Sequence, residues 1–133
     1  MKVLVIEDSS VIRERMCDML RRISCVELVG KPDNEEETVR SICTMTPDVV
    51  ILGSSSVRDS LDMLRRIKMQ PIPIKVIVMT NKIYSQYRKK CMDSGADYFL
   101  DKTRDIELLS SLLYCLADGT PHQEPGLREH EFE

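Results

Sequence analysis

Five short runs of apolar, largely β-branched residues recur along the chain. Continuous apolar runs of this length are typical of strands that are buried on both faces, as in a parallel sheet. The pattern therefore predicts five buried strands. They are Val3–Ile6, Val26–Val29, Val49–Leu52, Lys75–Met79 and Tyr98–Leu100.

Between these runs, apolar residues recur at helical spacing, with charged residues on the other faces. The five predicted stripes run over Ile12–Ile23, Val39–Met45, Leu61–Ile67, Ile83–Met92 and Ile106–Leu116. Ser9 or Ser10 is a candidate cap for the first helix. Pro47 and Gly95 are expected to follow the ends of the second and fourth helices, and Gly119 the end of the fifth.

Strands that alternate with helices predict an α/β fold, in which right-handed crossovers place helices on both faces of a parallel sheet. We expect a doubly wound five-stranded parallel sheet in a three-layer sandwich, formed by residues 1–119 as one domain. Residues 120–133 contain two prolines and little periodicity, and are expected to form a C-terminal tail.

Composition narrows the classes of protein. The 133 residues carry a net charge of −3, which argues against a nucleic-acid binder with a basic face. No apolar run approaches the roughly 20 residues of a membrane span, and the N-terminal apolar run is too short for a signal peptide. The five cysteines are odd in number and lack C-x-x-C spacing, which favours reduced cysteines in a cytoplasmic protein over disulfides or a zinc site.

Candidate chemistry gathers where the predicted strands end. In an open parallel sheet, ligands bind at the carboxyl ends of the strands. The residues at these ends are Glu7, Asp8, Gly53, Thr80 and Lys102. We therefore expect them to lie together in one site.

These stretches resemble the receiver domain of two-component response regulators. The resemblance rests on four segments: residues 3–9, 47–52, 76–80 and 95–102. It covers nearly the whole chain, from Lys2 to about Gly119. The resemblance implies a flavodoxin-like (CheY-like) fold with strand order 2-1-3-4-5.

The resemblance also implies a role for each residue of the site. In that family a histidine kinase donates a phosphoryl group to an aspartate at the end of the third strand. Glu7 and Asp8 match the acid pair that holds Mg²⁺ there. Thr80 and Lys102 match the residues that contact the phosphoryl group, and Phe99 matches the aromatic residue that responds to it.

The phosphoacceptor position departs from the family, because Gly53 occupies it and has no side chain. We therefore expect no aspartyl phosphorylation there, at most weak Mg²⁺ binding, and a direct pair between Lys102 and Glu7 or Asp8. The loop of residues 54–60 is rewritten too, which favours a natural degenerate receiver over an engineered substitution. Asn81 and Thr103 are further departures at the mouth of the site.

The leading hypothesis is a stand-alone pseudo-receiver, without enzymatic activity, that acts by contact with a histidine kinase or another regulator. A homodimer is one arrangement that this hypothesis allows. Its expected contact surface comprises Tyr84, Gln86, Arg88, Lys89, Lys90, Tyr98 and Asp101. Alternatives are a phosphorelay receiver with another acceptor, for which the serines at 54–56 are candidates, and a small-molecule sensor in a pocket vacated at Gly53. An electron carrier of flavodoxin type is a further alternative, although the chain has no tryptophan to stack on a flavin.

Overall fold

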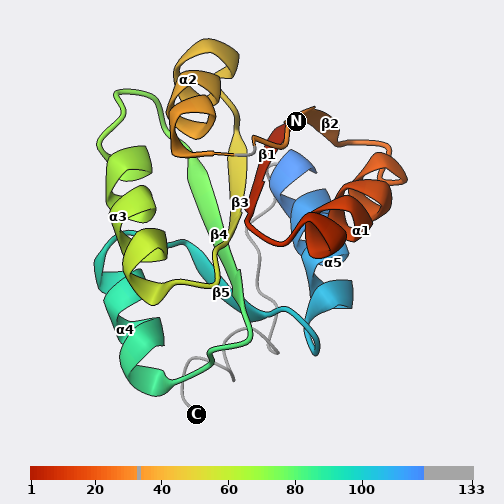
Figure 1. The fold of residues 1–133 in the computed structure, drawn as a ribbon. Helices are drawn as coiled ribbons and strands as arrows, with labels where there is room; N and C mark the ends of the chain where they lie inside the picture. The colour runs from red at the N-terminus through yellow and green to blue at the C-terminus, as the bar shows by residue number, and fades with distance from the viewer. Residues whose placement is uncertain (33, 119–133) are drawn as a thin grey trace.

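The computed structural model describes residues 1–32 and 34–118, which form one five-stranded parallel sheet with five helices (Figure 1). The strands are β1 (Lys2–Glu7), β2 (Glu27–Gly30), β3 (Val49–Gly53), β4 (Lys75–Thr80) and β5 (Tyr98–Asp101). The helices are α1 (Ser10–Arg21), α2 (Glu35–Met45), α3 (Val57–Lys68), α4 (Ser85–Asp93) and α5 (Ile106–Asp118). The strand order is β2-β1-β3-β4-β5, which confirms the predicted α/β fold.

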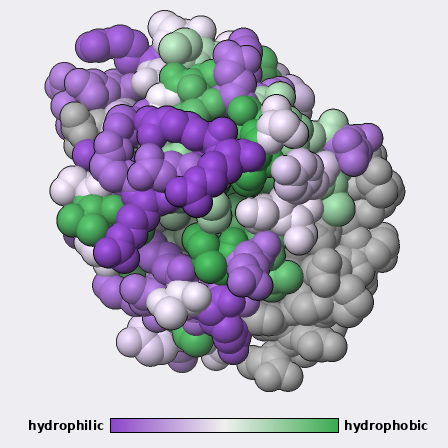
Figure 2. Space-filling view, turned by 90° about the vertical axis from the view of Figure 1, so that its right-hand side faces the viewer, coloured by the Kyte–Doolittle hydropathy of each residue, from purple (hydrophilic) through white to green (hydrophobic). Residues whose placement is uncertain are grey.

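The helices cover the sheet in two layers. α1 and α5 lie on one face, and α2, α3 and α4 lie on the other (Figure 1). Each face packs its own apolar core, because successive side chains of a strand point to opposite faces. On β3, Ile51 belongs to the α1–α5 core, whereas Leu52 belongs to the core under the other three helices. Seen from the α1–α5 side, hydrophilic residues predominate on the described surface, with smaller hydrophobic patches between them (Figure 2).

Polar side chains fix where three of the helices begin. The side chains of Ser9, Asn34 and Ser56 accept hydrogen bonds from backbone N–H groups in the first turns of α1, α2 and α3. Ser9 is thus the cap of the first helix. For α3 the cap is Ser56. Asp59 lies in the first turn, where its charge complements the helix dipole.

At the two ends of α4, the predicted glycine stop is confirmed, whereas the predicted start of the apolar stripe is wrong. Gly95 follows α4 with a φ of 109°, a left-handed conformation that glycine adopts without steric cost. At the other end, Ile83 precedes the helix and is 50% exposed, so it does not belong to the apolar stripe. Gly119 and the predicted tail lie outside the described residues.

Among the described residues, no helix is both long and apolar enough to cross a membrane.

Candidate functional site

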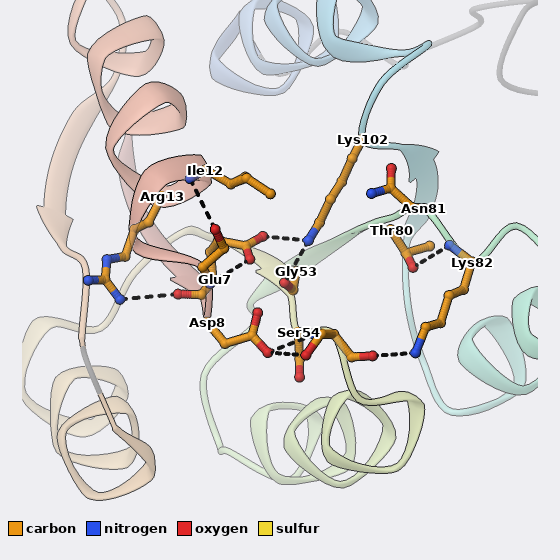
Figure 3. A network of polar contacts seen from close by, with 12 residues as sticks. Glu7, Asp8, Ile12, Arg13, Gly53, Ser54, Thr80, Asn81, Lys82 and Lys102 are labelled. Atoms are coloured by element: carbon orange, nitrogen blue, oxygen red, sulfur yellow. Dashed lines mark hydrogen bonds and ion pairs between the residues drawn. The ribbon is translucent and has the colours of Figure 1, made fainter.

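The carboxyl ends of the strands bring the predicted site residues to one edge of the sheet (Figure 3). Glu7 ends β1 and faces Gly53, the last residue of β3, in the parallel register. Thr80 ends β4, and Lys102 directly follows β5. The predicted gathering of these residues is confirmed.

A buried ion pair lies at the centre of this edge. Lys102 Nζ is 2.7 Å from Glu7 Oε1 and donates a hydrogen bond of 3.0 Å to the carbonyl oxygen of Gly53 (Figure 3). Glu7 is 2% exposed, and the Lys102 side chain is 11% exposed. Glu7 Oε2 accepts a hydrogen bond of 3.0 Å from the Ser9 N–H. Of the two expected partners of Lys102, the structure selects Glu7.

Burial and pairing act in opposite directions on Glu7. Burial penalises the charged form and raises the pKa of Glu7, while the Lys102 ammonium and the Ser9 N–H lower it. Burial is the larger effect, so the pKa stays above its ordinary value. The Glu7 carboxylate is therefore held in an environment that favours its protonation.

The space beside Gly53 is filled. A Cβ atom at position 53 would lie 2.5 Å from Glu7 Oε1, 3.2 Å from Lys102 Cε and 3.3 Å from the Met79 carbonyl oxygen. The 2.5 Å contact is closer than a Cβ atom tolerates, so Glu7 would have to shift to make room for a side chain at position 53. The prediction of a vacated pocket at Gly53 is therefore wrong, because Glu7 and Lys102 lie in that space.

Asp8 is held by the loop that follows β3. Asp8 Oδ2 accepts hydrogen bonds from the N–H of Ser55, at 2.9 Å, and from its hydroxyl, at 2.5 Å. Burial raises the pKa of Asp8, but the two bonds from Ser55 and smaller contributions from Glu7 and Lys102 outweigh it, so the pKa lies below its ordinary value. The Asp8 carboxylate is thus ionised and already partnered.

The serine loop contributes more than the sequence indicated. Ser54 Oγ accepts a hydrogen bond of 3.1 Å from the Ser56 N–H, and Ser56 caps α3. Ser55 also links Asp8 to the loop after β4, because its carbonyl oxygen accepts a hydrogen bond from Lys82 Nζ. Sequence reasoning missed the roles of Ser55 and Lys82. Their only signal was proximity to strand ends.

A second set of polar contacts involves Thr80 and the two residues that depart from the family pattern, Asn81 and Thr103. Thr80 is buried, and its Oγ1 accepts a hydrogen bond of 2.9 Å from the Lys82 N–H. The Thr103 hydroxyl donates a hydrogen bond of 3.3 Å to Asn81 Oδ1, which links the loops after β4 and β5. The residues that replace the family's usual ones at this mouth therefore contact each other.

Phe99 lies in the core between the sheet and α4. It is buried and meets the ring of Tyr87 edge to face, with ring centroids 5.5 Å apart and planes at 79°. Burial raises the pKa of Tyr87 to about 12, so the phenol is neutral and its ring belongs to the apolar layer. Phe99 thus points inward.

The resemblance implies Mg²⁺ at the acid pair, and the residues as arranged do not fit it. Mg²⁺ requires a near-octahedral set of oxygens. Here Glu7 Oε1 faces the Lys102 ammonium, and Asp8 Oδ2 accepts two hydrogen bonds. Among residues 1–32 and 34–118, no group of three His, Cys, Asp or Glu side chains is placed to hold a metal ion. Weak Mg²⁺ binding stays a prediction.

Curated relatives are regulators and enzymes longer than the matched segment. A protein-glutamate methylesterase/protein-glutamine glutaminase of Halalkalibacterium halodurans is 31% identical over 128 residues, which cover 91% of this chain and 37% of that protein. A putative transcriptional regulator of Pseudomonas aeruginosa is 30% identical over 126 residues, which cover 94% of this chain and 60% of that protein. The chain thus spans less than two thirds of these relatives.

Solved structures agree on the fold. The isolated REC domain of RcsB from Salmonella enterica serovar Typhimurium matches with a TM-score of 0.83 at 17% identity, covering 100% of this chain and 99% of that one. The response regulator domain of Thermotoga maritima CheB matches with a TM-score of 0.73 at 19% identity, covering 94% and 98%.

Fold and site together define a CheY-like α/β domain, with an acid pair, a threonine and a lysine at the carboxyl ends of its strands. The family model "Response regulator receiver domain" matches residues 3–114, and the chain belongs to this family. It is a receiver domain of two-component signalling. Such domains interact with signalling proteins.

Proposed function

We propose that this domain is an atypical receiver that signals by protein contact without aspartyl phosphorylation at position 53. One observation carries the proposal: position 53 has no side chain, and the Glu7–Lys102 pair lies against the point where one would begin. Glycine supplies neither a nucleophile nor a metal ligand. The remaining polar residues of the site bind one another, and this favours one fixed arrangement over a switch controlled by phosphate.

The pair supplies the charge balance that an acceptor aspartate would otherwise provide. Lys102 contacts Glu7 on β1 and the Gly53 carbonyl oxygen on β3, while its own backbone continues β5. A buried charge without a partner is costly, so the pair resists separation. Thr80 likewise accepts its hydrogen bond from the adjacent Lys82 N–H. The domain would therefore hold its conformation without a phosphoryl group.

The proposed contact surface is the α4–β5–α5 face expected from the resemblance. At its edge Tyr84 is 68% exposed, beside the exposed Ile83. Lys89 pairs with Asp93 on the same helix at 3.0 Å, which neutralises part of the basic cluster. These features support a partner that covers an aromatic and aliphatic patch with polar surroundings. We propose a histidine kinase or another signalling regulator in that role.

Intact mass after incubation with acetyl phosphate and Mg²⁺ tests the proposal, with Gly53→Asp treated in parallel. We expect no phosphoryl adduct on the native protein, because position 53 carries no carboxylate. An adduct on the variant alone would identify a disarmed but otherwise competent site and support the proposal. An adduct on the native protein would refute it, and peptide mapping would then identify the true acceptor.

A further inference from the structure

A separate cavity opens on the other side of the acid pair. It has a volume of about 190 Å³ and lies between the carboxyl ends of β1 and β3 and the N-terminal ends of α2 and α3. Its apolar lining includes Ile6, Leu52, Pro32 and Met63. A cavity of about 150 Å³ with apolar walls binds benzene, so this one is large enough for a small organic molecule.

The polar lining of the cavity is acidic. Its carboxylates are Glu7, Asp8, Glu35, Asp59 and Asp62. No lysine or arginine is among the described residues that line it. The cavity therefore combines an apolar body with a negatively charged mouth.

Three of these carboxylates have cationic partners outside the lining. Lys102 pairs with Glu7, Arg66 pairs with Glu35, and Arg65 lies 3.7 Å from Asp62. Asp8 and Asp59 form no ion pair with any residue in the described ranges. Two carboxylates that line the cavity thus have no direct ion-pair partner.

The helix ends reduce this charge without cancelling it. Each helix N-terminus carries about half a positive elementary charge, so α2 and α3 together contribute about one. Against the two carboxylates of Asp8 and Asp59, a net charge of about −1 remains. One cationic group would neutralise the cavity, whereas an anion would be repelled.

We propose that this cavity binds a small organic monocation with an apolar body, of the arylalkyl- or alkylammonium class. The apolar body would lie against Ile6, Leu52 and Met63, and the ammonium group would lie between Asp8 and Asp59. The cavity shares Glu7 and Asp8 with the acid pair but is not lined by Gly53, so the proposal does not require a carboxylate at position 53. It gives the domain an input other than a phosphoryl group.

Isothermal titration calorimetry with three probes tests separately the requirement for a positive charge and the requirement for an apolar body. Phenethylammonium carries both charge and ring, phenethyl alcohol has the ring without the charge, and methylammonium has the charge without the ring. We expect phenethylammonium to bind at one site per chain, at least tenfold more tightly than either of the others. Equal binding of the alcohol would refute the charge requirement. Equal binding of methylammonium, or of Mg²⁺ as an additional probe, would refute the requirement for an apolar body.

The variant Asp59→Asn localises the binding. It removes one uncompensated charge at nearly constant shape, and we expect phenethylammonium affinity to fall at least fivefold. Asp18→Asn is the matched control, since Asp18 is an exposed carboxylate on α1 outside the cavity. The affinity of this variant for phenethylammonium should equal that of the native protein. Equal losses in both variants, or no binding of phenethylammonium to the native protein at millimolar concentration, would overturn the proposal.

Discussion

At the scale of single residues, Glu7 and Gly53 depend on each other. They face each other across β1 and β3, and the Glu7 carboxylate lies where a side chain at 53 would begin. The glycine leaves room for the buried carboxylate, and a side chain at position 53 would require that carboxylate to move. Sequence reasoning identified both positions and the pairing of Lys102. It could not foresee that Glu7 fills the space, because that depends on a side-chain conformation.

The first prediction concerns the fit at position 53. Gly53→Ala should lower the free energy of unfolding by about 1–3 kcal/mol, because its Cβ would lie 2.5 Å from Glu7 Oε1. In a Glu7→Ala background the same change should cost much less, or stabilise slightly, since alanine is favoured over glycine within a strand. Urea unfolding of the four proteins measures the coupling. Equal costs in both backgrounds would show that Glu7 does not restrict position 53.

The second prediction concerns a restored aspartate. Gly53→Asp adds a third carboxylate beside Glu7 and Asp8, so we expect a lower melting temperature without Mg²⁺. Added Mg²⁺ should recover stability, because three carboxylates supply more of the oxygen ligands that it requires. The native protein is the control, and its melting temperature should barely respond to Mg²⁺. A variant insensitive to Mg²⁺ would contradict the prediction.

The third prediction concerns pH. The pKa of Glu7 is raised in the folded state above its ordinary value of 4.5, so between 4.5 and the folded pKa the native state binds more protons than the unfolded state. The contribution of Glu7 to stability is therefore fully present below pH 4.5 and falls as pH rises through this window, by at most about 1.4 kcal/mol per pH unit.

Urea unfolding of the native protein and of Glu7→Gln across pH 4.5–7.5 checks this contribution. The difference in the free energy of unfolding between the two proteins should shrink as pH rises, because glutamine does not titrate. A difference that grows with pH would mean that the pKa of Glu7 is lowered on folding.

At the scale of elements, the loop between β3 and α3 is where sequence and structure differ most. Periodicity located both elements, because buried strands and amphipathic helices leave strong patterns. The loop carries no such pattern. Its serines were interpreted as a polar loop or as candidate phosphosites, yet Ser55 binds Asp8 and Ser56 caps α3. The contact of Ser55 with Asp8 joins residues 47 positions apart, and no local signal encodes it.

The fourth prediction concerns the start of α3. Ser56→Ala removes the oxygen that accepts the Asp59 N–H, so it should cost about 1 kcal/mol of stability. Ser111→Ala, in the middle of α5 and exposed, is the matched control and should be neutral or slightly stabilising. Thermal or urea unfolding compares the two variants. Equal stability of Ser56→Ala and the native protein would show that the cap contributes nothing.

At the scale of the whole molecule, alternation of strands and helices was enough to predict a parallel sheet covered on both faces. The order 2-1-3-4-5 was implied only by the resemblance, because periodicity does not specify which strands are neighbours. The order then explains the site, since it places β1 beside β3 and brings Glu7 to Gly53. The cavity beside the acid pair was not foreseen, because it depends on how α2 and α3 pack.

The contacts of Lys102 have a consequence for local opening of the sheet. This side chain starts after β5 and reaches both β3 and β1, although β4 lies between β5 and β3. Separating any of these strands at their carboxyl ends would expose the Glu7–Lys102 pair or break it. The fraying that strand ends commonly undergo is therefore opposed here by one side chain, and backbone amides at this edge should exchange with solvent only in larger openings of the domain.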